Sequence, residues 1–178
     1  MTDGKSRIES ELEVRSYLQN LKYALDHDAQ ITFQEVRQVD QKREIRQTNA
    51  YTIAKLFPNE NPADALRREL KTLTVKEYMR TVKDLRFPKR SEMREFGKVY
   101  NGSKDVYIKI RVELLSAYGK HTAFVMSFHF AAEAFTPEMF PYGEHSVVIP
   151  LNVESRQMEM PACPVNSLPE GTKAQARK

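Results

Sequence analysis

Residues 106–114 have the sequence VYIKIRVEL, and residues 124–130 have the sequence FVMSFHF. In both segments apolar side chains recur at every second position. This alternation is typical of a β-strand that presents one face to a hydrophobic core. A turn is expected around residues 117–121, between the two segments. Together the two segments predict an antiparallel β-hairpin.

The same alternation predicts which side chains share the outer surface of this hairpin. Both apolar sets are even-numbered, so burying them on one face pairs even with even positions and odd with odd positions. A turn centred near Tyr118 would place Tyr107 opposite His129 and Lys109 opposite Ser127. Because cross-strand neighbours lie about 5 Å apart at Cβ, a phenol, an ammonium and an imidazole could reach one phosphate.

Positive charge is concentrated in the middle of the chain. Residues 70–120 contain 13 Lys and Arg against 6 Asp and Glu, an excess of +7, whereas residues 1–69 sum to −1 and residues 121–178 to −2. Such a distribution suits a surface that binds a polyanion. A solvated face with scattered lysines would give the same count, so charge alone does not separate the two interpretations.

Helices are predicted mainly before the hairpin. Residues 11–27 have apolar side chains at three- and four-residue spacing, which is typical of an amphipathic helix. Thr48, Asn61 and Thr74 are capping residues, and Thr74 forms a capping box with Glu77. The expected helices cover residues 11–27, residues 48–56, a segment that opens at residues 61–62, and residues 74–83. The charged segment 37–46 is expected to be either a helix or a loop.

The predicted fold class is α+β, with an antiparallel β-sheet packed against N-terminal helices. A further strand is expected at residues 93–100, followed by a turn at Asn101-Gly102, and a short extended piece at residues 30–33. We expect one domain over residues 11–155, a flexible N-terminus over residues 1–10 and a disordered tail over residues 156–178. After the hairpin, Phe135, Met139, Phe140 and Tyr142 are expected to cover a sheet edge, and residues 146–153 are expected to add a strand.

Several classes of protein receive no support from the sequence. No run of 18 apolar residues is present, and the polar first 13 residues predict no secretory signal. The single cysteine, Cys163, forms no internal disulfide, so a reducing cytoplasm is the expected location. The six glycines form no phosphate-binding loop, and the four histidines are too dispersed for a zinc site. We therefore expect no cofactor and no metal.

The chemistry that these residues favour is metal-free cleavage of a phosphodiester. This reaction needs a base for the ribose 2′-hydroxyl, cations for the charged phosphorane and an acid for the leaving 5′-oxygen. Histidine can serve as acid or base near neutrality, lysine and arginine supply the charge, and an aromatic ring can stack an unpaired base. The outer surface of the predicted hairpin and its neighbouring sequence offer Tyr107, Lys109, Arg111, His129, Arg80, Arg86, Lys89, Arg90 and Arg94.

These residues also resemble a known family. VYIKI at residues 106–110 and VMSFH at residues 125–129 resemble the last two strands of the MqsR toxins, which are RelE-like mRNA interferases of bacterial toxin–antitoxin systems. LTVKEYMR at residues 73–80 is similar to the helix start before that family's sheet, and residues 93–100 to its first long strand. The resemblance covers about residues 12–131, and this chain is longer, with an insertion between residues 40 and 73 and a C-terminal tail.

The resemblance implies a RelE-like fold, endoribonuclease activity on mRNA and a cognate antitoxin as partner. Tyr107 matches the family's active-site tyrosine. Arg80 and His129 stand where the family has lysines, and Arg94 stands where it has a glutamine. The implied product is a 2′,3′-cyclic phosphate.

The leading hypothesis is therefore an endoribonuclease toxin. In it His129 acts as general acid or base and Tyr107 positions or stacks the substrate. Lys109, Arg80 and Arg94 stabilise the scissile phosphate. Further RNA contacts are expected from Arg86, Lys89, Arg90 and Arg111. The alternative is a non-catalytic RNA- or protein-binding protein, for example phage or mobile-element encoded, on the same scaffold. A third possibility is a plain protein–protein surface on the hairpin.

Overall fold

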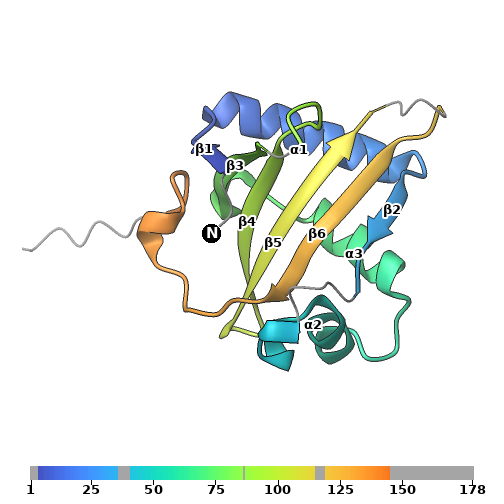
Figure 1. Cartoon of the computed structure of the whole chain (residues 1–178), viewed down its shortest axis with the longest axis vertical. Coiled ribbons are helices and arrows are strands. Elements are labelled where there is room, and N and C mark those ends of the chain that lie inside the picture. The colour runs from blue at the N-terminus through green and yellow to red at the C-terminus, as the bar shows by residue number, and fades with distance from the viewer. Residues whose placement is uncertain (1–3, 36–40, 86, 115–118, 145–178) are drawn as a thin grey trace, which may run out of the picture. The chain divides into compact units, whose positions relative to one another are not determined.

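The structure is a computed structural model that describes residues 4–35, 41–85, 87–114 and 119–144. It contains a six-stranded sheet with the strand order β1-β3-β4-β5-β6-β2 (Figure 1). The strands are β1 (Gly4–Arg7), β2 (Gln30–Phe33), β3 (Tyr78–Asp84), β4 (Met93–Tyr100), β5 (Lys104–Glu113) and β6 (Thr122–Phe130). The expected α+β class is confirmed. The sheet is mixed, however, because β2 pairs with β6 in parallel while the other neighbours are antiparallel.

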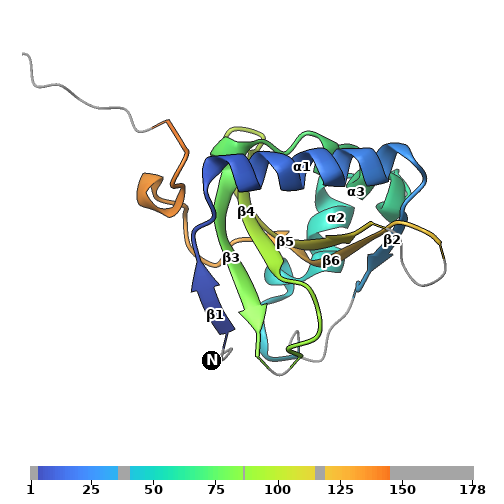
Figure 2. The ribbon, with the colours of Figure 1, turned by 90° about the horizontal axis from the view of Figure 1, so that it is seen from above.

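Three of the four predicted helices are present. They are α1 (Glu11–Asp26), α2 (Asn49–Leu56) and α3 (Pro62–Lys71). The side chains of Thr48 and Asn61 cap α2 and α3 as expected, and Ser10 caps α1. Helices α1 and α3 lie on the same side of the sheet (Figure 2). We call the opposite side the outer face, and among the described residues it carries no α-helix.

The fourth predicted helix is wrong. Thr74 and Glu77 do form the capping box, with the Thr74 amide donating to Glu77 Oε2 at 2.7 Å, but only one 3-10 turn, η3 (Val75–Glu77), follows. The chain then becomes β3, which pairs with β4 on one side and with β1 on the other. Pairing on both sides outweighs the local helix signal, and it also orders Gly4–Arg7, which were expected to be flexible.

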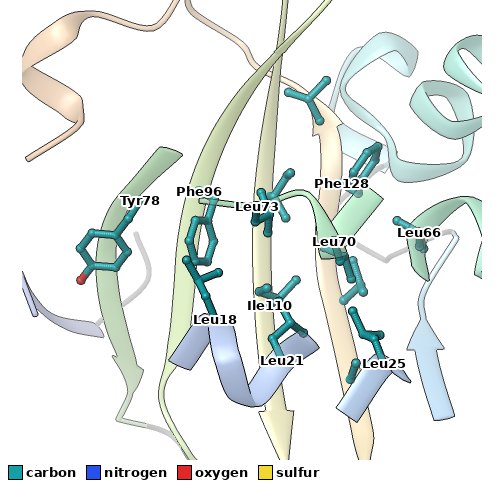
Figure 3. Packing of buried hydrophobic residues seen from close by; sticks show 14 of the residues in the cluster. Leu18, Leu21, Leu25, Leu66, Leu70, Leu73, Tyr78, Phe96, Ile110 and Phe128 are labelled. Atoms are coloured by element: carbon teal, nitrogen blue, oxygen red, sulfur yellow. The ribbon is translucent and has the colours of Figure 1, made fainter. Parts of the chain in front are cut away.

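The hydrophobic core lies between the sheet and the helices α1 and α3. Leu18, Leu21 and Leu25 of α1 and Leu66 and Leu70 of α3 pack against the helix-facing side of the strands (Figure 3). The sheet contributes Tyr78, Phe96, Ile108, Ile110 and Phe128, all of which are buried. The even-numbered positions of β4 and β5 therefore face the helices.

A β-bulge in β6 changes the expected pairing halfway along the hairpin. Ile108 pairs with Phe128, as even-with-even pairing requires, but Ile110 pairs with Val125 because the register shifts after Lys109. Val125 is buried and Phe124 is only partly buried, so the prediction that all even-numbered residues of β6 face the core is wrong for this half. A bulge inserts one residue into one strand, and everything beyond it turns to the other face.

Helix α2 completes the edge of β6 beyond the point where β2 ends. The Asn49 side-chain amide donates to Met126 O at 3.1 Å, while its oxygen accepts from Phe128 N at 3.0 Å. Thr52 Oγ1 accepts from Phe130 N at 2.9 Å. Since a buried backbone group without a partner is costly, these two side chains replace a missing strand.

The chain after β6 covers part of the outer face. A Cβ at Gly97 would lie 2.7 Å from Phe135 Cε2 and 2.8 Å from Phe140 Cζ, so both rings occupy the space that a side chain would need. Phe135 and Phe140 thus pack on the face of the sheet at the inner strand β4, so the expectation that they cover its edge is wrong for these two residues. Residues 37–40, the strand expected at residues 146–153 and the tail at residues 156–178 lie outside the described residues. In the part of the chain that the structure describes, no helix combines the length and apolar character needed to cross a membrane.

Candidate functional site

The pairing of β5 with β6 places Tyr107 opposite His129 and Lys109 opposite Ser127, as the sequence predicts. The rings of Tyr107 and His129 have centroids 5.5 Å apart with an interplanar angle of 37°. Their neighbours Ile108 and Phe128 point into the core, so these odd-numbered residues lie on the outer face. The expected gathering of a phenol, an ammonium and an imidazole is therefore present.

A buried glutamate, Glu95, lies next to the lysine and the tyrosine of this arrangement. Glu95 pairs with Lys109 across β4 and β5 and with Arg80 across β3 and β4. Its carboxylate accepts from Arg80 Nε at 2.7 Å and lies 3.1 Å from Lys109 Nζ. The residue is only 2% exposed. We call Arg80, Glu95, Tyr107, Lys109 and His129 the outer-face cluster.

The electrostatics of the cluster keep Glu95 ionised. Burial raises the pKa of its carboxyl, but hydrogen bonds from Tyr107 and Arg80 and the charge of Lys109 together lower that pKa below its ordinary value. The hydrogen bond to Glu95 in turn raises the pKa of Arg80. The carboxylate therefore orients two cations and a phenol. Because the Arg80 side chain is 54% exposed, part of its guanidinium remains accessible to an anion.

The imidazole of His129 is held in one tautomer. Its Nδ1 lies 3.0 Å from Phe130 O, and since a carbonyl only accepts, Nδ1 carries the hydrogen. In the neutral ring Nε2 then has the lone pair of a base. The guanidinium of Arg43 lies 3.4 Å from Nε2, and His129 is 9% exposed. Arg43 thus adds a further positive charge beside the imidazole.

The sequence did not predict two residues of this site, Glu95 and Arg43. Glu95 was not predicted as a site residue. It lies opposite Lys109 in the pairing of β4 with β5, but the sequence alone does not give the register of that pairing. Arg43 comes from the charged segment that was expected to be a helix or a loop. That segment ends in the 3-10 turn η2 (Ile45–Gln47), and no local pattern indicates that it lies against β6.

Arg94 does not join the cluster. It is even-numbered on β4, and its guanidinium lies 4.4 Å from the centre of the Tyr17 ring of α1 and 2.7 Å from Glu9 Oε1. These contacts hold it on the helix-facing side of the sheet. The expectation that Arg94 meets Tyr107 at the phosphate is therefore wrong, because alternate residues of a strand point to opposite faces.

The residues expected to contact RNA are spread more widely. Lys89 and Arg90 are exposed in the loop that joins β3 to β4, with the Arg90 guanidinium 4.3 Å from the centre of the Phe87 ring. Arg111 lies on the outer face, where its guanidinium is 5.3 Å from the Phe124 ring centre and its Nε is 3.2 Å from Glu113. Arg86 lies outside the described residues.

Comparisons of the chain with protein-family models, with curated proteins and with solved structures give no match. Among the described residues there is also no group of three or more His, Cys, Asp and Glu side chains that could hold a metal ion. The geometry of the outer-face cluster is therefore the basis for a proposed function.

Proposed function

We propose that this chain is an endoribonuclease on a RelE-like α+β scaffold, similar to the MqsR toxins, that cleaves RNA without a metal. The observation that carries the proposal is a single face on which Arg80, Lys109 and Tyr107 surround the buried carboxylate of Glu95 and Tyr107 also lies beside His129. A base, two cations and an aromatic ring are the groups that cleavage of RNA through its own 2′-hydroxyl requires.

In the proposed reaction Nε2 of His129 takes the proton of the ribose 2′-hydroxyl. The resulting oxyanion attacks the adjacent phosphorus, the bond from phosphorus to the 5′-oxygen breaks, and a 2′,3′-cyclic phosphate forms. The leaving 5′-oxygen takes a proton from solvent, and the imidazolium returns its proton to solvent. Arg80 and Lys109 stabilise the charge that develops on the phosphate oxygens.

Two further residues, Glu95 and Arg43, assist the reaction without taking part in it. Glu95 does not react, because it is buried and engaged by Arg80 and Lys109. It holds these cations in place, and positioned donors stabilise a transition state better than mobile ones do. Arg43 lies beside Nε2, so an incoming phosphate can draw its guanidinium away and release the imidazole as a base.

The test is cleavage of a single-stranded RNA in EDTA by wild type, His129→Ala and His27→Ala. His27 is an exposed histidine at the end of α1 and serves as the matched control. We expect wild type and His27→Ala to produce 2′,3′-cyclic phosphate ends and His129→Ala to be inactive. Cleavage that needs a divalent metal, or full activity in His129→Ala, would refute the proposal. As a toxin, the protein should also arrest growth when its synthesis is induced.

One observation favours a second function, a non-catalytic RNA-binding protein on the same scaffold. Nε2 of His129 faces Arg43, and little of the ring is exposed, as for a structural histidine. This alternative predicts salt-dependent RNA binding with no cleavage and no growth arrest. Stable RNA after prolonged incubation with a protein that binds it would select this alternative.

A further inference from the structure

A second feature of the molecule is a pocket of about 540 Å³ at the end of the sheet where β5 begins and β6 ends. It lies between α2, the β4–β5 turn and the first residues after β6. Its lining includes Tyr51, Lys55, Lys104, Asp105 and Phe130. Asp105 precedes Tyr107 by two residues on β5 and therefore shares its face, whereas Phe130, which directly follows His129, packs toward the core at the end of β6. Two residues span about 6.6 Å along a strand, so the pocket is close enough to receive the nucleotide next to a phosphate held at the cluster.

The pocket contains a platform for stacking. The rings of Tyr51 and Phe130 meet edge to face, with centroids 6.2 Å apart, and both side chains are partly exposed. Proteins that bind single-stranded RNA stack unpaired bases on such rings. Lys55 and Lys104 add positive charge at the same pocket for the sugar–phosphate backbone.

The pocket also contains an oriented hydrogen-bond acceptor. Asp105 Oδ2 accepts from Phe135 N at 2.7 Å, and Asp105 O accepts from Ala131 N at 2.8 Å, so the residue is fixed by the chain that follows β6. An ionised carboxylate accepts hydrogen bonds and donates none. Glu44 and Glu133 add two more carboxylates to the lining. A base with an exocyclic amino group suits such a pocket better than one whose edge carries carbonyl oxygens.

We infer that this pocket binds one unpaired nucleobase of the RNA next to the scissile phosphate. Tyr51 stacks on the base, and Asp105 selects bases that carry an exocyclic amino group. The inference rests on the proposed function, because it takes RNA as the substrate. It goes beyond that function by naming a base-selective subsite, since nothing in the cleavage chemistry requires a particular base.

The experiment measures binding of nucleoside 5′-monophosphates, which contain no scissile phosphodiester, by NMR titration of the full chain. Two pairs are compared: GMP and IMP differ only in the amino group, whereas CMP and UMP also differ in whether the neighbouring ring nitrogen N3 carries a hydrogen. In each pair we expect wild type to bind the amino-bearing nucleotide about tenfold more tightly, the loss expected when a buried polar group has no partner. Equal affinities within either pair would overturn the inference.

Three variants locate the binding. Tyr51→Ala should weaken binding of CMP and GMP about tenfold, as for the loss of one base–aromatic stack, whereas Tyr51→Phe should retain it. Asp105→Asn can still accept from Phe135 N, but it should bring the CMP/UMP and GMP/IMP ratios close to one. Tyr23→Ala, at an exposed tyrosine of α1, is the control and should bind as wild type does.

The outcomes for the pocket and for the nuclease are separate. Wild type that cleaves RNA, but whose nucleotide binding is unchanged by Tyr51→Ala and Asp105→Asn, would disprove the pocket and leave the nuclease standing. Wild type that binds amino-bearing nucleotides through Tyr51 and Asp105, yet never cleaves RNA, would disprove the nuclease and leave the pocket as part of an RNA-binding protein.

Discussion

Tyr107 and His129 lie directly opposite each other on β5 and β6, with their ring centroids 5.5 Å apart on the outer face of the sheet. The tyrosine contributes two separate features, a ring beside the imidazole and a hydroxyl that hydrogen-bonds with Glu95. The two features can be separated by substitution.

Replacing Tyr107 should affect RNA cleavage in two steps. Tyr107→Phe keeps the ring and removes the hydrogen bond to a charged group, which is worth about 1.5 kcal/mol, so we expect kcat/KM to fall about tenfold. Tyr107→Ala also removes the stacking surface and should lower kcat/KM about a hundredfold. Single-turnover cleavage of one RNA by both variants is the measurement. Equal losses in the two variants would mean that the ring contributes nothing.

Glu95→Gln should destabilise the protein at neutral pH. The substitution leaves Lys109 and Arg80 without their buried counter-charge, at a cost of about 2 kcal/mol once the exposure of Arg80 is taken into account. The pKa of the Glu95 carboxyl is below its ordinary value, so its stabilising effect is complete above that ordinary value and disappears as the pH falls through the lowered pKa.

The difference in stability between wild type and Glu95→Gln should therefore be largest near pH 7 and shrink below about pH 4. Urea unfolding at several pH values measures it. Glu60→Gln, at an exposed glutamate, is the control and should change little. A difference between wild type and Glu95→Gln that does not vary with pH would contradict the assignment of Glu95 as an ionised, paired group.

Gly97→Ala should loosen the chain after β6. The added methyl would collide with Phe135 and Phe140, and an overpacked contact of this kind costs about 1–3 kcal/mol. In a Phe140→Ala background the same methyl should cost less, because Phe135 then has room to shift. A double-mutant cycle of unfolding free energies measures this coupling. An additive cycle would show that the Phe140 ring does not restrict residue 97.

Asn49→Ala should lower the free energy of unfolding by about 3 kcal/mol. The substitution removes the partners of Phe128 N, Met126 O and Gln34 O, and of these three residues Phe128 is buried and Met126 is partly buried. Asn20→Ala, at an exposed position of α1, is the matched control and should change the stability by less than about 0.5 kcal/mol. Chemical denaturation compares them, and equal midpoints would show that α2 does not complete the sheet edge.

Several parts of the fold follow from local sequence. The alternation in residues 106–110 predicts a strand with Tyr107 and Lys109 on one face, and the structure confirms both. Thr48 and Asn61 begin helices as expected, since a cap requires only the first turn that follows it. At Asn101 and Gly102 the chain turns with positive φ values of 50° and 73°. Each of these signals involves residues close together in sequence.

The tertiary structure decided what depends on pairing between distant segments. The bulge in β6, opposite Lys109 and Ile110, turned Phe124 away from the predicted core face. Pairing with strands on both sides made β3 a strand despite the capping box at Thr74. Glu95 became part of the outer-face cluster only because β3, β4 and β5 align Arg80, Glu95 and Lys109. A sequence specifies which side chains alternate along a strand, whereas register between strands is set by the packing of the whole sheet.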